Sequence, residues 1–127
     1  MPDGVSRASL NDVTEGRFQG LRAPLGVKSF GINKIVLAPG EDGKIHRHRS
    51  QEEVYLVLDG TLTLVVEGEP QELGPGELVR LAPNVRRQIL NRGSVELSLL
   101  ALGGMVEHEH VAGDGELFSA WEETAGG

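Results

Sequence analysis

The chain has 127 residues, 18 of them glycine and none of them cysteine, and a formal net charge of −7 at neutral pH. A chain of this length forms one domain with a core of its own. Without cysteine it has no disulfide, no thiolate metal ligand and no cysteine nucleophile. The negative charge argues against nucleic acid as a partner, because that role needs a basic surface.

No apolar run approaches the roughly 20 residues of a membrane-spanning helix. Residues 1–7 lack the basic-then-apolar order of a secretory signal. We therefore expect a cytoplasmic protein that binds neither membrane nor nucleic acid.

Short β-rich runs separated by glycine and proline predict an all-β fold. In chain order, strands are expected near residues 16–22, 27–37, 44–48, 53–58, 61–67, 72–73, 78–81, 86–91 and 95–102. Asp59-Gly60 predicts a two-residue hairpin with positive φ, and turns are expected at 68–70 and 75–76. Helical periodicity is faint and confined to 116–122. This order of strands is typical of a small antiparallel β-barrel or double-sheet jelly roll.

The whole chain, residues 1–127, is expected to form this single domain. Its parts are N-terminal strands within 13–37, a central core at 40–91 and a C-terminal segment at 103–127. Phe118 and Trp121 are expected to pack the C-terminal segment against the barrel, as aromatic anchors do.

The strongest functional signal is His46-x-His48, followed by Glu53. Because side chains alternate along a strand, His46 and His48 project from the same face. Glu53 opens the next strand and can fold back against them. Two imidazoles and one carboxylate are the smallest ligand set that holds a divalent transition metal while leaving positions open for a substrate.

These residues are framed by Gly40 and Gly60, with five, four and six residues separating glycine, histidine pair, glutamate and glycine. In every element this spacing resembles the first motif of the cupin superfamily. The resemblance implies a cupin barrel in which His46, His48 and Glu53 hold iron, manganese, nickel or zinc.

The superfamily's second motif is only partly present. Gly74-Pro75-Gly76-Glu77 begins it, Ala82-Pro83-Asn84 stands where Pro-x-Gly is usual, and Asn91 fits its closing asparagine. Counting from both ends places the fourth ligand of the family on Arg87. Arginine stays protonated in proteins and offers no lone pair to a metal.

Arg87 allows three arrangements. In the first, its guanidinium replaces the metal and pairs with Glu53, in a bond that can be bidentate. In the second, a metal sits on His46, His48 and Glu53 while Arg87 faces the vacant side and attracts an anion. In the third, Arg87 points outward and pairs with a surface acid.

Other residues are candidates for the same pocket. Tyr55 shares the face of Glu53 and carries a hydroxyl that can donate to a ligand. Asn91 shares the face of Arg87 and is a candidate ligand-binding residue, although its position near a strand end favours hydrogen bonds to the backbone. Gln88 can replace the missing ligand only if the strand has a bulge.

His108 and His110 form a second His-x-His after the last expected strand. They can act as a lid, as an extra ligand, or simply as part of a solvated acidic loop. No framing residues accompany them.

The strand at 53–58 is apolar on both faces, because Val54, Leu56 and Leu58 oppose Glu53, Tyr55 and Val57. A strand of this kind is normally covered on both sides. We expect the N-terminal strands or a second subunit to cover the outer face, and the resemblance to the cupins favours a homodimer.

Two functions remain open. The first is a metal-dependent oxygenase, isomerase or decarboxylase that acts on a small anionic molecule. The second is a non-catalytic, metal-free module for ligand binding or sensing, in which Arg87 is paired with Glu53. Fold alone does not separate them. Because imidazole binds metal only when neutral, metal occupancy is expected to fall below roughly pH 6.

Overall fold

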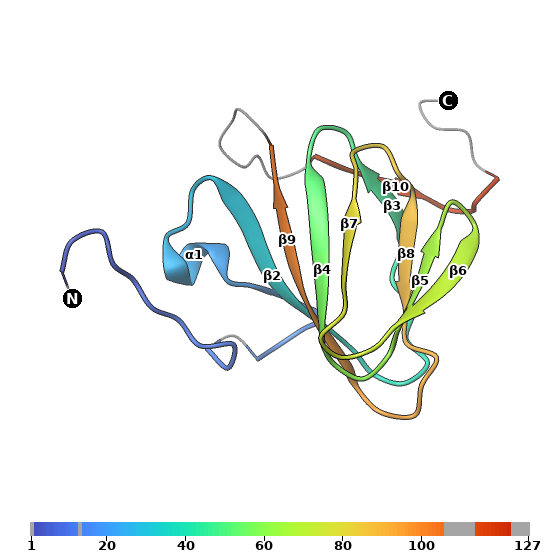
Figure 1. Ribbon diagram of the computed structural model, residues 1–127, viewed down its shortest axis with the longest axis horizontal. Coiled ribbons are helices and arrows are strands. Elements are labelled where there is room, and N and C mark those ends of the chain that lie inside the picture. Colours follow the sequence, from blue (N-terminus) through green and yellow to red (C-terminus); the bar gives the residue numbers. More distant parts are fainter. Residues whose placement is uncertain (1, 13, 106–113, 123–127) are drawn as a thin grey trace.

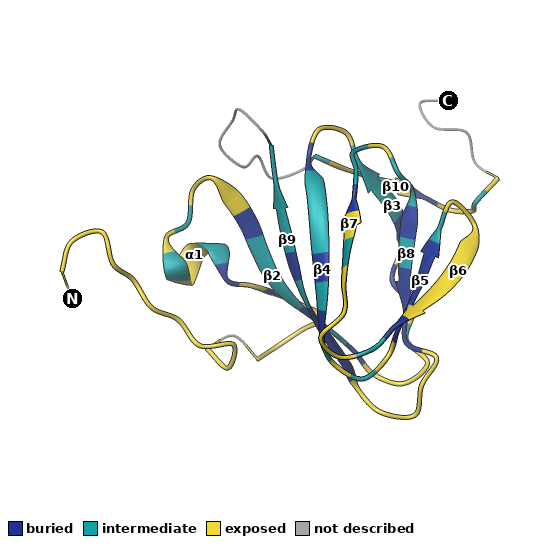
Figure 2. Cartoon of the chain, viewed as in Figure 1, coloured by how far each residue is buried: buried dark blue, intermediate teal, exposed yellow. Residues whose placement is uncertain are grey.

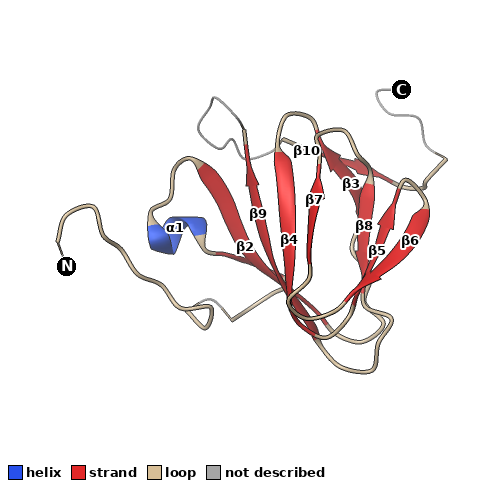
Figure 3. Ribbon diagram, in the orientation of Figure 1, coloured by secondary structure: helices blue, strands red, loops and turns tan. Residues whose placement is uncertain are grey.

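The computed structural model describes residues 2–12, 14–105 and 114–122 of the 127. The described residues form strands with one short helix (Figure 3). The elements are β1 (Phe18–Gly20), α1 (Arg22–Leu25), β2 (Phe30–Leu37), β3 (Ile45–His48), β4 (Glu52–Asp59), β5 (Leu62–Val66), β6 (Glu69–Leu73), β7 (Leu78–Leu81), β8 (Arg87–Leu90), β9 (Leu97–Gly104) and β10 (Gly115–Phe118). In this part of the chain, no helix is long and apolar enough to cross a membrane.

The strands form two antiparallel sheets of five strands, ordered β1-β2-β9-β4-β7 and β10-β3-β8-β5-β6. Figure 1 shows the first sheet on the left and the second on the right. The predicted all-β, double-sheet fold is confirmed. All nine expected strands are present, with ends that differ by three residues or fewer from the predicted ones.

The expectation that helical periodicity is confined to 116–122 is wrong in two respects. Residues 22–25 form α1, which ends at Gly26 with a φ of 74°. Helical periodicity was expected at 116–122, but Gly115–Phe118 is strand β10 and pairs antiparallel with β3. β10 thereby supplies hydrogen-bond partners to a strand that would otherwise be a sheet edge.

Gly60 has the positive φ that Asp59-Gly60 predicts, 79°, but it does not form a hairpin. β4 pairs with β7 and β9 while β5 pairs with β6 and β8, so the chain passes from one sheet to the other at this point. A Cβ on Gly60 would lie 2.5 Å from the Glu96 carbonyl oxygen. The two-residue hairpin lies instead at Glu67-Gly68, between β5 and β6, where both φ values are positive.

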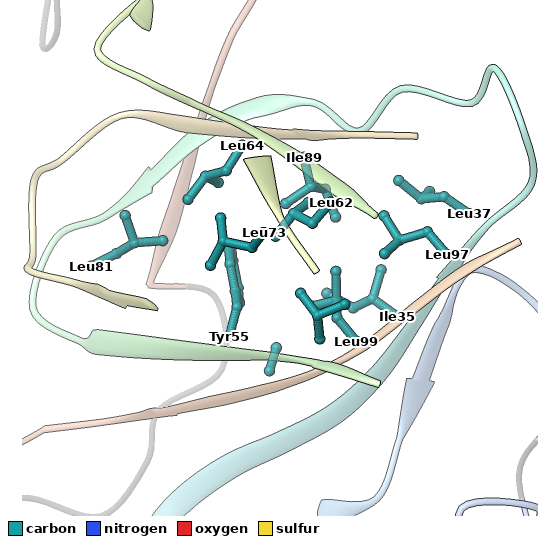
Figure 4. Close-up of a cluster of buried hydrophobic side chains, with 12 residues drawn as sticks. Ile35, Leu37, Tyr55, Leu62, Leu64, Leu73, Leu81, Ile89, Leu97 and Leu99 are labelled. Carbon is teal, nitrogen blue, oxygen red and sulfur yellow. The ribbon is translucent and has the colours of Figure 1, made fainter. Parts of the chain in front are cut away.

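The core lies between the two sheets and is built from inward-facing aliphatic side chains (Figure 4). Leu37, Leu62, Leu64, Leu97 and Leu99 are each 0% exposed. Figure 4 also shows Tyr55 standing among them, and its side chain is 1% exposed. Burial of this apolar surface is the main driving force for the fold.

The outer face of β4 is not covered by the N-terminal strand. β1 pairs with β2 and extends the sheet at its edge. Val54 and Leu56 remain partly accessible, and Leu78, the neighbour of Leu56 on β7, is 63% exposed. The described residues before β1 are themselves mostly coloured as exposed in Figure 2.

Candidate functional site

Three strands bring the predicted site residues together from both sheets. β3 presents His46 and His48, whose ring centroids are 5.5 Å apart with an interplanar angle of 87°. β8 presents Arg87, which is the Cα partner of His46. β4, in the other sheet, presents Glu53 and Tyr55. The alternation of side chains along each strand therefore directs all five side chains towards the same part of the interior.

His46, His48 and Glu53 form the group that could hold a metal among the described residues. One ligand atom from each residue lies within 4.8 Å of the other two. His48 Nε2 is 3.5 Å from Glu53 Oε2. His46 Nδ1 is 3.1 Å from the carbonyl oxygen of Lys44. A proton on that Nδ1 leaves the Nε2 lone pair available to a metal.

Arg87 is completely buried, with 0% of its surface exposed. Its Nη1 donates to the carbonyl oxygen of Val85 at 2.7 Å, and its Nη2 lies 3.6 Å from Glu53 Oε1. The outward-pointing arrangement of Arg87 is therefore wrong. The pair with Glu53 is made by one nitrogen, so the guanidinium is not bidentate.

Several polar atoms at this end of the interior have no hydrogen-bond partner within the described part of the chain. They include Glu53 Oε1, Arg87 Nε, Arg87 Nη2 and His48 Nδ1. Buried polar atoms without partners reduce stability, and in native proteins they often mark a place for an ion, a water or a ligand. The site thus has unused capacity to bind a polar group.

The pKa values of the site residues follow from their burial and their neighbours. Burial alone would raise the pKa of Glu53, but hydrogen bonds from His48 and Tyr55 and the charges of His48 and Arg87 lower it. Burial lowers the pKa of His46. Burial, helped by the charge of Glu53, raises the pKa of Tyr55 well above its usual value. At neutral pH the site therefore offers a carboxylate, a neutral imidazole and a protonated phenol.

A cavity of about 470 Å³ leads to these residues. Its polar lining comprises Arg17, Asn33, Lys44, His46, His48, Glu53 and Tyr55. Its other lining residues are Phe18, Ile35, Gly43, Ile89, Ala101 and Leu117. The metal-ligand candidates thus occupy one end of a cavity whose walls are largely apolar.

Asn91 and Gln88 do not join the site. Asn91 is 0% exposed and its Nδ2 donates to the carbonyl oxygens of Leu37 and Val95, each at 2.9 Å. It is not among the residues that line the cavity. Gln88 donates to the carbonyl oxygen of Gly43 at 3.0 Å and does not replace the missing ligand. His108 and His110 lie outside the described residues.

The structure also shows site residues that no sequence motif marks. Asp114 Oδ2 accepts the backbone N–H groups of Ser50 and Gln51 at 2.9 Å and lies 3.8 Å from His48 Nδ1. Lys44 directly precedes β3 and lines the cavity together with the two histidines. Asp114 is far from His48 in sequence, so only the pairing of β10 with β3 could have revealed it.

Comparison with solved structures agrees with this architecture. A cupin protein from Bacteroides fragilis superposes with a TM-score of 0.73, covers 84% of this chain and 88% of its own, and is 23% identical. A putative sugar phosphate isomerase from Acidithiobacillus ferrooxidans has a TM-score of 0.64 and 28% identity, over 72% of this chain and 60% of that one.

Sequence comparison finds an uncharacterised protein of Methanocaldococcus jannaschii that is 28% identical over 75 residues. The match covers 59% of each chain, so this chain spans about three fifths of that relative. The family model of the cupin domain matches residues 33–103. Since this match spans more than half of the sequence and contains the complete first motif, the chain belongs to the cupin superfamily.

Proposed function

We propose that this cupin binds a divalent transition metal through His46, His48 and Glu53 and takes a small anionic molecule in the adjoining cavity. The observation that carries the proposal is the convergence of three ligand atoms within 4.8 Å at one end of that cavity. A set of two imidazoles and a carboxylate suits iron, manganese, nickel or zinc.

The donor set fits a metal chemically. A metal ligand must be a neutral imidazole or a carboxylate, and the lowered pKa values of His46 and Glu53 favour these forms at neutral pH. A bound metal would act as a Lewis acid towards a ligand oxygen. The chain's own contribution is to hold the donors in place and to supply Tyr55 as a buried hydroxyl beside Glu53.

Arg87 sets the charge of the loaded site. A divalent ion with one carboxylate carries a net charge of about +1, and the guanidinium raises this to about +2. At ~4 Å and an effective dielectric constant near 20, each pair of unit charges interacts by about 4 kcal/mol. A loaded site therefore favours an anionic ligand such as a carboxylate, an enolate or a phosphate.

Three metal-dependent reactions suit such a site: oxygenation, isomerisation and decarboxylation of a small anion. The name of the Acidithiobacillus ferrooxidans structure, a putative sugar phosphate isomerase, agrees with isomerisation of an anionic substrate. We also propose that the protein is cytoplasmic, as expected from the sequence.

A second candidate is a metal-free module for ligand binding or sensing. It is favoured by the 3.6 Å separation of Arg87 Nη2 and Glu53 Oε1, because the guanidinium then neutralises the carboxylate without a metal. In this form the imidazoles and the guanidinium bind the anion directly.

Elemental analysis of protein purified without a metal-affinity tag separates the two candidates. The first predicts one transition metal per chain, lost in the variants His46→Ala and Glu53→Gln. Gln88→Ala is the matched control, because Gln88 faces away from Arg87 on the same strand and should keep the metal. A protein that contains no metal and cannot be loaded with any of the four metals would support the second candidate.

Arg87→His provides a complementary test. It should raise metal affinity, because it restores a fourth ligand and removes a positive charge. Isothermal titration with Zn²⁺ measures the change. An unchanged affinity would mean that position 87 does not act on the metal.

We also propose that the chain forms a homodimer through the outer face of the sheet β1-β2-β9-β4-β7. Neighbouring outward positions on this face carry Ile32, Val54, Leu56, Leu78, Leu100 and Leu102. A contiguous accessible apolar patch of this kind is typical of a protein interface. Sedimentation of the wild type should give a dimer and Leu78→Glu a monomer; a monomeric wild type would overturn the proposal.

A further inference from the structure

We infer that the cavity selects an organic acid with an apolar body over a polyhydroxylated sugar phosphate. The inference deepens the proposed function and rests on it, because the acidic head group is assigned to the end that holds His46, His48 and Glu53. It concerns the part of the cavity that lies beyond the three metal-ligand candidates.

Much of the described cavity lining beyond the polar end is apolar. Ile35 from β2, Ile89 from β8 and Ala101 from β9 are buried members of the core that also line the cavity. A ligand that reaches past the metal end contacts hydrocarbon from three strands. Such a surface binds an aliphatic or aromatic body and offers nothing to a hydroxyl group.

Two large apolar side chains extend this lining on the edge strands. Phe18 on β1 is 64% exposed, and Leu117 on β10 is 66% exposed. Both line the same cavity, although their strands belong to different sheets. An apolar ligand between them would bury surface that is now in water, at about 25 cal/mol for each Å².

Polar partners along the walls are few. Apart from the polar end and the two cationic residues, Asn33 is the only polar side chain among the described residues that line this cavity. A sugar phosphate brings several hydroxyl groups, and each one buried without a partner costs about 1–3 kcal/mol. The walls therefore discriminate against the hydroxyl groups of a sugar phosphate.

The two cationic residues of the lining differ in their partners. Arg17 is paired with Glu41 and donates to the carbonyl oxygen of Asp42, so its charge is already matched. Lys44 is exposed and makes no ion pair with any described residue. Lys44 lines the same cavity as His46 and His48, and its positive charge attracts the carboxylate of an incoming acid.

The size of the cavity suits such a ligand. Its volume of about 470 Å³ lies within the range of roughly 300–1,000 Å³ that small-molecule pockets occupy. Among the described residues, the arrangement is an anion site at one end, apolar walls along the cavity and an exposed lysine that makes no ion pair with any of them.

Isothermal titration with matched probes tests the inference. 3-Phenylpropionate and gluconate are both monocarboxylates, but one has an apolar body and the other a polyhydroxylated body. Glucose 6-phosphate represents the sugar phosphates. We expect 3-phenylpropionate to bind about tenfold more tightly than either of the other two. Equal or tighter binding of gluconate or glucose 6-phosphate, or no binding of 3-phenylpropionate, would overturn the inference.

Metal content is measured on the same protein before each titration. A protein that takes up no metal counts against the proposed function, yet its ranking of the three probes still decides the inference. A fully loaded protein that prefers gluconate refutes the inference and leaves the metal site standing.

Variants locate the apolar contact. Phe18→Ser and Leu117→Ser should each weaken 3-phenylpropionate about fivefold and leave gluconate and the metal content unchanged. Phe30→Ser is the matched control, because Phe30 is 38% exposed but does not line this cavity. An equal effect of Phe30→Ser would place the ligand elsewhere.

Lys44→Gln should weaken the binding of 3-phenylpropionate in low salt and have no effect on it in high salt, because exposed charges are screened.

Discussion

The interior of the barrel has two ends of opposite character. At one end, leucine side chains such as Leu37, Leu62 and Leu97 are fully buried and make contact with other hydrocarbon. At the other end, the inward positions carry His46, Glu53 and other polar residues that include unpaired buried atoms. The first end is a core like that of any small β-protein, whereas the second contains what a core normally excludes.

β4 runs through both ends and shows the change most clearly. Its inward positions are Val57, Tyr55 and Glu53, in order from the apolar end to the polar end. On β8 the same step leads from Ile89 to Arg87. One strand thus provides packing energy at one end and a chemically active group at the other. We conclude that the apolar end offsets the cost of burying charges at the polar end.

The largest effect is expected from a cavity in the apolar end. Leu97→Ala removes a side chain that is 0% exposed and should lower the free energy of unfolding by about 4 kcal/mol. Urea unfolding measures the change. Val95→Ala, at a side chain that is 61% exposed, is the control and should change the stability by less than about 0.5 kcal/mol. Metal content of the folded Leu97→Ala protein should stay that of the wild type.

A smaller effect is expected from removing a charge at the polar end. Glu53→Gln leaves the guanidinium of the buried Arg87 without a counter-charge and should destabilise the metal-free protein by about 3 kcal/mol. Adding Arg87→Met to this variant should restore most of the loss, because the uncompensated charge is then gone. Strictly additive effects in urea unfolding would show that the two side chains are not coupled.

The apolar end and the polar end of the interior differ in how well they could be predicted from the sequence. Strand alternation identified the core strands, and the spacing of His46, His48 and Glu53 identified one half of the site, because both depend on residues close together in the chain. Arg87 allowed three arrangements, since its burial depends on how β8 is placed against β3 and β4. The family resemblance located the position but could not orient its side chain.

The cavity itself was beyond sequence reasoning. Phe18, Lys44 and Leu117 line one cavity because β1 and β10 end their sheets beside β2 and β3. The sequence shows only faint helical periodicity at 116–122 and no strand there, so the pairing of β10 with β3 and the position of Asp114 near His48 could not be foreseen. Long-range strand pairing is the information that a single sequence does not provide.

The smallest effect distinguishes two asparagines, one at each end. Asn91 uses its side-chain amide for the backbone of three residues, Leu37, Gly93 and Val95, away from the cavity. Asn91→Ala should therefore destabilise the protein by about 2 kcal/mol and leave metal and ligand binding unchanged. Asn33 lines the cavity. Asn33→Ala should therefore weaken the binding of gluconate, because this ligand loses a polar partner in the cavity wall. The stability of the protein should change little. Urea unfolding and isothermal titration on both variants measure the two effects. A loss of ligand binding in Asn91→Ala would contradict the division of the interior into a structural and a functional end.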